Sequence, residues 1–383
     1  MNYPNERPAT RASPGCTRGE FLRRSSQGLG AAALLSALPA AARAEASPSP
    51  RANVSVSRFD LREFVQWIVT ELEPSVRLPG GAGRYARKPG EKECEIYGTS
   101  DIACILYSIG RLRPSPRERA EWAASFQQFQ RDDTGWLVEK SRTHDPLHNT
   151  AFTLAAMQLL DLEPGRPVTM PAEFAHPTEF LGELDWRTAV YLESHKGAGA
   201  GAIHALVPAL RRKAWFDEYF AFCDALFDPR NGMMGRDKPA GGDSDQVGGT
   251  FHYGFLYEHF NRHMPFPEAR IDAVLRTQMP DGYWRVDNHL WLTLDAIYLM
   301  TRSLRYTTHR FDDVRACVRR LMGILMRDVY SPEGRKTALS PTIPVHSVTA
   351  AISIAAEVQR FLGADEVVTD EPLRLVLDRR PFI

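Results

Sequence analysis

Apolar residues recur along the chain at helical spacing, in segments that are separated by polar loops. Several segments are apolar on nearly all faces, among them 99–112, 149–162, 249–262, 293–305 and 346–362. A helix that is apolar all round must be buried. The segments 62–72 and 312–329 are amphipathic and are typical of helices on an outer layer. Because strict alternation of apolar and polar residues is almost absent, the pattern predicts an all-α protein.

A glycine-bearing turn, a polar loop and an apolar helix return at a near-constant interval. The turn glycines are Gly83, Gly135, Gly232, Gly282 and Gly334, and the gaps between them are 52, 97, 50 and 52 residues. The long gap contains a degenerate copy, whose loop lies near Gly182 and whose apolar helix starts at His195. Six units of this size predict stacked helical hairpins.

We expect these hairpins to close into a ring, an (α/α)6 toroid over residues 58–383. No unit has the polar surface of a capping repeat, which favours closure over an open solenoid. The helices that begin near residues 99, 149, 197, 249, 293 and 346 should form the inner layer, around a central cavity. The more amphipathic helices should lie outside them.

The first 44 residues have the three parts of an export signal. A basic stretch with Arg18, Arg23 and Arg24 precedes the apolar run 28–40, and 42–44 (Ala-Arg-Ala) fits a cleavage site. The stretch 17–23 is similar to the twin-arginine consensus, although Gly19 stands where the second arginine belongs. Residues 1–44 are therefore predicted to be a twin-arginine-like signal peptide and 45–57 a linker, which implies a periplasmic or secreted protein. Export by the general secretory route is the alternative.

Charge and hydropathy exclude two classes of partner. The predicted signal carries six of the 47 Lys and Arg and two of the 47 Asp and Glu, which leaves 41 basic and 45 acidic residues. A mildly acidic chain without a basic cluster is a poor nucleic-acid binder. No later apolar run reaches the roughly 20 residues of a membrane span. The remaining cysteines form no CxxC pattern, and Cys104, Cys223 and Cys317 fall in apolar helices as core thiols.

Histidines gather at one position of the repeat, where the inner helices begin. Six of the eleven histidines lie there: His144, His148, His195, His252, His289 and His346. Each one alone is more typical of a helix cap or a buried hydrogen-bonding group. As a set that converges on one mouth of the ring, they indicate a functional cavity, because histidine exchanges protons near neutral pH.

The expected catalytic residues are His195 and His252 as acid–base groups, with Asp295 or Asp101 as the carboxylate partner. Asp295 stands in an apolar helix, so that it must be paired, protonated or used in catalysis. The expected substrate-binding residues are His144, His148, Asn149, Tyr253, His289, Trp291 and His346.

Metal binding is an alternative that the residues leave open, and no cofactor is expected. His144 and His148 are four residues apart, a spacing that holds zinc on a helix, but the intervening Pro146 argues against a helix there. Asp243 and Asp245 lie in a glycine-rich segment that could supply calcium ligands or a substrate loop. A flexible loop is the equally simple interpretation of that segment.

One turn carries a resemblance to a known group of proteins. The segment 278–284 (Gln-Met-Pro-Asp-Gly-Tyr-Trp) resembles the QxxxGxW repeat of triterpene cyclases, and 130–136 is a looser version. The chain as a whole resembles the α/α-toroid superfamily, which includes six-hairpin glycosidases, polysaccharide lyases and protein prenyltransferases. In such motifs glycine makes the turn, tryptophan packs between helices and glutamine bonds the backbone, so that the resemblance concerns fold and not reaction.

Three functions compete. An exported carbohydrate-active enzyme, either a polysaccharide lyase or a glycoside hydrolase, fits export, a polar cavity and the aromatic residues near it. A terpenoid cyclase or prenyltransferase-like protein fits the turn motif, but the chain has no DxDD motif and its expected cavity positions are polar. A non-catalytic binding ring is the third, and it predicts a cavity that side chains fill.

Overall fold

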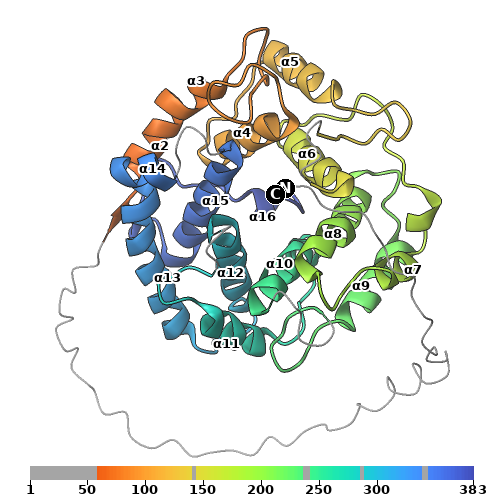
Figure 1. Cartoon of the computed structure of the whole chain (residues 1–383), viewed down its shortest axis with the longest axis vertical. Coiled ribbons are helices and arrows are strands. Elements are labelled where there is room, and N and C mark those ends of the chain that lie inside the picture. The colour runs from red at the N-terminus through yellow and green to blue at the C-terminus, as the bar shows by residue number, and fades with distance from the viewer. Residues whose placement is uncertain (1–57, 140–143, 236–241, 285–288, 339–343) are drawn as a thin grey trace, which may run out of the picture. The chain divides into compact units, whose positions relative to one another are not determined.

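Six long helices pack against one another in a closed circuit in the computed structural model of the protein (Figure 1). Each packs against two others, in the order α4, α6, α8, α10, α12, α15 and back to α4. The structure describes residues 58–139, 144–235, 242–284, 289–338 and 344–383, so the predicted signal and linker lie outside it. The six helices are α4 (Ile96–Ser108), α6 (Pro146–Leu159), α8 (Val190–Leu206), α10 (Asp243–His259), α12 (His289–Ser303) and α15 (Val345–Leu362).

These are the helices that the fifty-residue repeat predicts for the inner layer. Each begins one to seven residues before the predicted start. Most of their residues are buried, because each helix is covered by two neighbours and by an outer layer. The all-α prediction is confirmed for the described residues, whose only strands form one short pair.

An outer helical segment precedes each inner helix along the chain. The outer segments are α2 (Arg62–Trp67) with the π-helix η1 (Ile68–Leu72) and α3 (Glu73–Val76), α5 (Pro116–Gln127), α7 (Pro177–Gly182) after the 3-10 turn η2 (Ala172–Phe174), α9 (Lys213–Asp224), α11 (Pro267–Thr277), and α13 (Phe311–Leu325) with the π-helix η3 (Met326–Tyr330) and α14 (Pro332–Ala338). Helix α13 shows the expected amphipathic pattern, since Val314, Val318, Leu321 and Leu325 are buried and share one face.

Contacts join the beginning and the end of the described chain. Strand β1 (Phe59–Asp60) pairs in parallel with β2 (Val367–Val368). The guanidinium of Arg335 on α14 makes two hydrogen bonds of 2.6 Å with the carboxylate of Glu63 on α2. The backbone N–H of Val345 donates to the carbonyl of Arg87 at 2.9 Å. The first and last units are thereby held together as neighbours.

The glycine turns have the chemistry that the repeat predicts. Gly83, Gly135, Gly232 and Gly282 all have positive φ angles, which glycine adopts without strain. Gln278 donates to the carbonyl of Gly282 at 2.8 Å, as Gln130 does to that of Gly135. The Trp284 indole N–H donates to the carbonyl of Val274. The fifth predicted turn glycine, Gly334, is instead part of helix α14.

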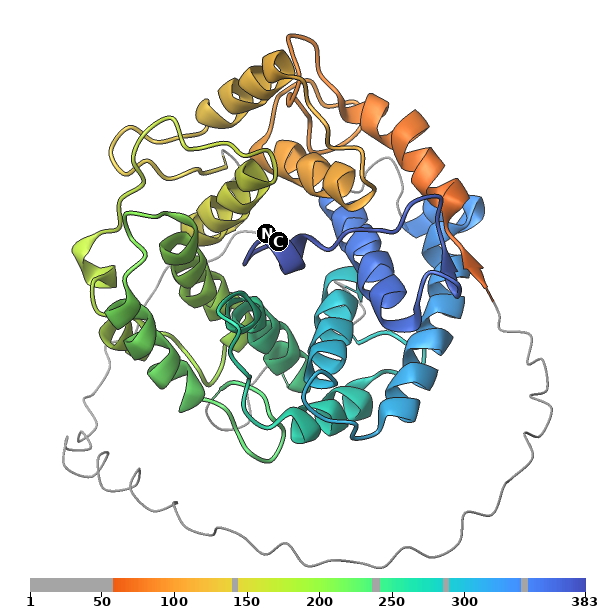
Figure 2. The same ribbon diagram turned by 180° about the vertical axis from the view of Figure 1, so that it is seen from behind.

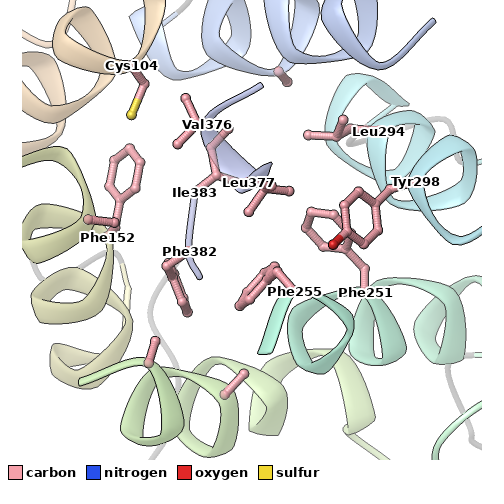
Figure 3. Packing of buried hydrophobic residues seen from close by; sticks show 14 of the residues in the cluster. Cys104, Phe152, Phe251, Phe255, Leu294, Tyr298, Val376, Leu377, Phe382 and Ile383 are labelled. Atoms are coloured by element: carbon pink, nitrogen blue, oxygen red, sulfur yellow. The ribbon is translucent and has the colours of Figure 1, made fainter. Parts of the chain in front are cut away.

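The C-terminal segment fills part of the centre of the ring, which the sequence analysis did not anticipate. Helix α16 (Val376–Arg379) and the residues after it lie inside the inner layer (Figures 1 and 2). Phe382 and Ile383 are buried, and Phe382 points toward Phe255 of α10, with ring centroids 5.0 Å apart (Figure 3). The expected central cavity is therefore closed over part of its length by the chain itself.

A buried ionic network ties α16 to the inner helices. Arg302 of α12 donates to Glu357 of α15 and to Asp378 of α16, each at 2.8 Å. Arg302 and Glu357 are both buried. Burial alone would lower the pKa of Arg302, but the surrounding carboxylates raise it above its ordinary value, so the guanidinium stays charged.

Two sequence expectations change at helix starts. Asp243 and Asp245, assigned to a glycine-rich loop, form the first turn of α10. Pro146 was taken as evidence against a helix, but it is the first residue of α6. At that position a backbone N–H would have no partner within the helix, so a proline costs no hydrogen bond there.

Cys104, Cys223 and Cys317 are buried thiols, as expected. No helix in the described ranges is both long and apolar enough to cross a membrane.

Candidate functional site

A chamber of about 170 Å³ lies among the inner helices and is lined mainly by imidazoles. Five of the six histidines singled out in the sequence lie on its wall. Its lining consists of His144, His148, Tyr191, His195, Phe251, His252, Trp291, Asp295, His346 and Ile383. The prediction that these histidines converge is thus met by residues from α6, α8, α10 and α15 and from the loop before α6.

Close packing of the inner helices brings the imidazoles together. A Cβ atom on Gly199 of α8 would lie 2.9–3.0 Å from the backbone of Leu147 and His148, so only glycine allows α8 to approach the start of α6 this closely. Gly249 of α10 meets Val190 of α8 in the same way. The ring centroids of His148 and His195 consequently lie 4.6 Å apart, and those of His195 and His252 4.9 Å apart.

His346 is paired with a buried carboxylate. Its Nδ1 lies 2.9 Å from Oδ1 of Asp101, and Thr349 donates to the same oxygen at 2.7 Å. The Asp101 side chain has no exposed surface, whereas that of His346 is 16% exposed. Asp101 therefore stands behind the imidazole and orients it, while the imidazole faces the chamber. The sequence analysis named Asp101 as a carboxylate partner without naming His346 as the residue that it holds.

A second imidazole–carboxylate pair lies beside the first. Nδ1 of His144 is 3.3 Å from Oε1 of Glu139, whose carboxylate also bonds Arg87 at 3.3 Å. Burial lowers the pKa of His144, although the hydrogen bond to Glu139 raises it in part. At neutral pH this imidazole is mainly neutral and able to accept a proton.

Hydrogen bonds fix the tautomer of His148. The hydroxyl of Tyr97 donates to Oδ1 of Asn149 at 2.9 Å, and its oxygen lies 2.8 Å from Nδ1 of His148. Since the hydroxyl has one proton and uses it toward Asn149, its oxygen accepts from Nδ1–H of His148. The lone pair of His148 is then on Nε2.

His252 is held in the same tautomer by different residues. Oγ of Ser194 donates to the carbonyl of Tyr191, and the same oxygen lies 2.9 Å from Nδ1 of His252. The hydroxyl proton is engaged, so Oγ accepts from Nδ1–H of His252. The carbonyl of Gly248 is a further backbone partner of this imidazole. The lone pair of His252 therefore also lies on Nε2.

The three histidines His148, His195 and His252 are close enough to share a metal ion. One nitrogen from each lies within 4.8 Å of the other two. Burial is the main reason that the pKa of all three lies below its ordinary value, to about 3 for His252. Neighbouring imidazoles lower it further, because the like charges of protonated imidazoles repel one another. All three are therefore neutral near pH 7, which is the form that binds metals.

Asp295 lines the chamber from α12 and is 2% exposed. Burial raises its pKa well above the ordinary range of a carboxyl group. Burial therefore favours the protonated form of this carboxyl group, which is the form that can donate a proton. The sequence analysis anticipated this from the charge in an apolar helix.

Trp291 supplies an aromatic wall and a hydrogen-bond donor. Its ring lies 4.2 Å from that of His346, and its buried Nε1 has no hydrogen-bond partner among the described residues. A second and larger pocket, of about 720 Å³, lies next to the chamber and shares His144 with it. Glu139 and Asn149 line that second pocket.

The remaining predicted residues lie elsewhere. Tyr253 is fully buried on the other side of α10, where it packs against Trp186 and Tyr219. Asn149 is buried behind Tyr97 and reaches the second pocket only. His289 is the first residue of α12, and its side chain lies outside the described residues.

Sequence reasoning missed several residues of the site. Tyr191 precedes His195 by one helical turn, so that the spacing could have identified it. Ser194 is adjacent to His195 in α8, and nothing in the sequence pattern distinguished it from its neighbours. Glu139 lies in an irregular segment, and Ile383 is in the C-terminal segment. Neither position belongs to the repeat.

Comparison with known proteins adds no relative. No protein-family model matches the chain, and neither a curated protein nor a solved structure matches it significantly. The function must therefore be inferred from the geometry of the chamber.

Proposed function

We propose that the chain is an exported carbohydrate-active enzyme, a polysaccharide lyase or glycoside hydrolase, which acts in the histidine-lined chamber of an (α/α)6 toroid. The observation that carries the proposal is the pair of imidazole–carboxylate couples, His346 with Asp101 and His144 with Glu139. Both imidazoles line the chamber and both carboxylates are fully buried behind them. An imidazole that a buried carboxylate orients is a common form of general base.

Of the two reactions, the composition of the chamber favours the lyase. A glycoside hydrolase needs two carboxyl groups that flank the scissile bond. Among the described lining residues, Asp295 is the only acidic one. A β-eliminating lyase needs a base that removes the proton next to a uronate carboxylate and an acid that protonates the leaving oxygen. His346 or His144 would be the base and the protonated Asp295 the acid.

The surroundings of the chamber fit a carbohydrate. Trp291 offers an aromatic surface and a donor N–H, and Tyr191 offers a second ring. The chamber itself is smaller than the roughly 300 Å³ of an ordinary ligand pocket. The larger pocket that shares His144 would hold the rest of the polymer. A polar lining of this kind disfavours the terpenoid alternative, whose substrate needs apolar walls.

The expected acid–base role of His195 and His252 stays a prediction. Imidazoles whose pKa lies this far below the ordinary range are weak bases and are not protonated at neutral pH. We therefore assign proton transfer to the two imidazole–carboxylate couples and Asp295. The structure suggests a different task for His195 and His252.

A screen with uronic-acid polysaccharides tests the proposal. Incubation of the full chain with such polymers should release oligosaccharides with a new carbon–carbon double bond, which absorbs in the ultraviolet. His346→Ala and Asp295→Asn should each lower the rate about 100-fold or more, while His263→Ala, at an exposed position, should not. New reducing ends without the double bond would indicate a hydrolase instead. No cleavage of any polysaccharide would contradict the proposal and favour a binding ring.

Export is a separate part of the proposal and rests on residues 1–44 alone. N-terminal sequencing of the protein from a bacterial periplasm should find Glu45 or a residue within a few positions of it. Retention of Met1 in the periplasmic protein would contradict cleavage.

A further inference from the structure

We propose that His148, His195 and His252 form a binding site for one divalent transition-metal ion of the zinc type. Three helices, α6, α8 and α10, each supply one imidazole to this site. The inference adds to the proposed function and does not depend on the identity of the substrate.

The number and kind of ligands fit a zinc ion. Three imidazole nitrogens within 4.8 Å of one another match the three protein ligands of a catalytic zinc site, whose fourth position is left for water or substrate. Nitrogen donors of this type favour Zn²⁺ and its neighbours over Ca²⁺ and Mg²⁺, which prefer oxygen. The site differs from the His144–His148 pair considered from the sequence, because His144 stands before α6 and bonds Glu139.

The orientation of two of the imidazoles also fits a metal site. A metal-binding histidine usually gives the proton of its other ring nitrogen to a protein acceptor, which fixes the tautomer. Both His148 and His252 show this arrangement, toward Tyr97 and Ser194 respectively. Their hydrogen bonds to the side chains of Tyr97 and Ser194 both involve Nδ1, so that these two bonds leave Nε2 of each imidazole for a ligand.

The placement of the cluster also favours a metal. His148, His195 and His252 line one chamber, so an ion bound there would be surrounded by nitrogen donors from three helices. A purely structural cluster would need no such convergence, because a buried imidazole is satisfied by one or two hydrogen bonds.

Binding requires only a small rearrangement. A tetrahedral ion with bonds of about 2.0–2.1 Å brings its ligands to roughly 3.4 Å from one another. The three nitrogens must therefore approach by an ångström or so. His195 makes no hydrogen bond with the described residues and packs edge-on against Tyr191, with ring centroids 5.0 Å apart. It is therefore the ligand with the greatest freedom to move.

Titration of the metal-free full chain tests the site directly. After treatment with a chelator, Zn²⁺ should bind with one equivalent per chain in calorimetry, and Co²⁺ should give the visible absorption of a tetrahedral site. His195→Ala should weaken binding at least 100-fold. His263→Ala is the matched control, since it removes an exposed histidine, and it should bind as the unchanged protein does. An excess of Mg²⁺ or Ca²⁺ should not compete.

Two further variants keep the test decisive if His195→Ala does not fold. Tyr97→Phe and Ser194→Ala retain all three imidazoles and remove only the acceptors of Nδ1–H. Each should keep one equivalent of Zn²⁺ but bind it about 10-fold more weakly or worse. Absence of a one-equivalent site, or unchanged affinity in His195→Ala or in both of these variants, would overturn the proposal. Zinc binding without polysaccharide cleavage would refute the proposed function and leave the metal site standing.

Discussion

Nδ1 of His346 lies 2.9 Å from Oδ1 of Asp101, although 245 residues separate the two in the chain. The pair joins α15, the last helix of the inner circuit, to α4, the first. The circuit therefore closes at the wall of the chamber, and one hydrogen bond both joins two inner helices and orients a lining residue. Asp101 is buried and also accepts from Thr349, so the imidazole is oriented by a carboxylate that is itself held in place.

The substitution Asp101→Asn should disturb the orientation of His346 while keeping the size of the side chain. An amide no longer selects the Nδ1–H tautomer, so that nitrogen NMR of the imidazole should show a mixture of tautomers. Turnover of the polysaccharide should fall by about 100-fold. Thr349→Val, which leaves the carboxylate in place, should change both properties less. Wild-type tautomer and turnover in Asp101→Asn would show that the carboxylate has no such role.

The ionic network around Arg302 should make a large contribution to folding. Arg302→Met leaves the carboxylate of Glu357 buried without its cation, a change that typically costs about 3–5 kcal/mol. The free energy of unfolding, measured in urea, should fall by that amount. Arg360→Met removes an exposed partner of Asp378 and should cost less than about 1 kcal/mol.

The double variant Arg302→Met, Glu357→Leu shows whether the loss of stability in Arg302→Met comes from the unpaired carboxylate of Glu357. Removal of both charges takes away the unpaired carboxylate, so this protein should be more stable than Arg302→Met alone. A double variant that is less stable than the single one would mean that other contacts of Glu357, such as the 2.6 Å bond from Thr301, dominate.

His204 should make stability depend on pH from a position away from the chamber. Its ring stacks on Trp215 with centroids 3.9 Å apart, and burial lowers its pKa to about 4. In the unfolded chain the pKa is about 6.5. As the pH falls below about 6.5, His204 is protonated in the unfolded chain but stays neutral in the folded chain. The free energy of unfolding therefore decreases until the pH reaches about 4, where the folded chain is protonated as well.

The size of this effect follows from the shift. Between pH 7 and pH 5 the contribution of His204 is about 2 kcal/mol, at roughly 1.4 kcal/mol for each pH unit below 6.5. Urea denaturation of wild type and His204→Gln at both pH values isolates it, because the other buried histidines titrate in both proteins. His263→Gln, at an exposed position, should leave the pH dependence unchanged. An equal pH dependence in His204→Gln would contradict the buried neutral imidazole.

The inner helices could be predicted because burial on all sides leaves a pattern in the sequence. Segments such as 346–362 are apolar all round, and the fifty-residue period set their order. The convergence of His195 and His252 followed from the same period. Gly334 shows where the method fails, since a glycine can end one helix or lie within another, and local sequence does not distinguish the two.

The site was less predictable because tertiary contacts complete it. Glu139 is only five residues before His144, but it lies in an irregular segment where the repeat predicts no site residue. Ile383 and Phe382 enter the centre from the chain end, which no repeat describes. Tyr253 was expected to bind substrate, but successive helical residues point about 100° apart, so that it lies on another face than His252 and packs on Trp186.

Phe382 should be a main support of the chamber floor. Its ring has no exposed surface and lies 4.9 Å from that of His148 and 5.0 Å from that of Phe255, so it fills the centre of the ring directly beside the histidine cluster. Phe382→Ala removes an aromatic ring from a space that six packed helices cannot close, and we expect a loss of about 3–5 kcal/mol in the free energy of unfolding. Urea denaturation measures it, with Leu192→Ala as the control, because Leu192 is 61% exposed on α8 and its loss should cost less than about 0.5 kcal/mol. The same variant should weaken zinc binding, since His148 loses the ring that it packs against. A loss of stability below about 1 kcal/mol would contradict this role, because it would mean that the packing of Phe382 contributes little to the stability of the ring.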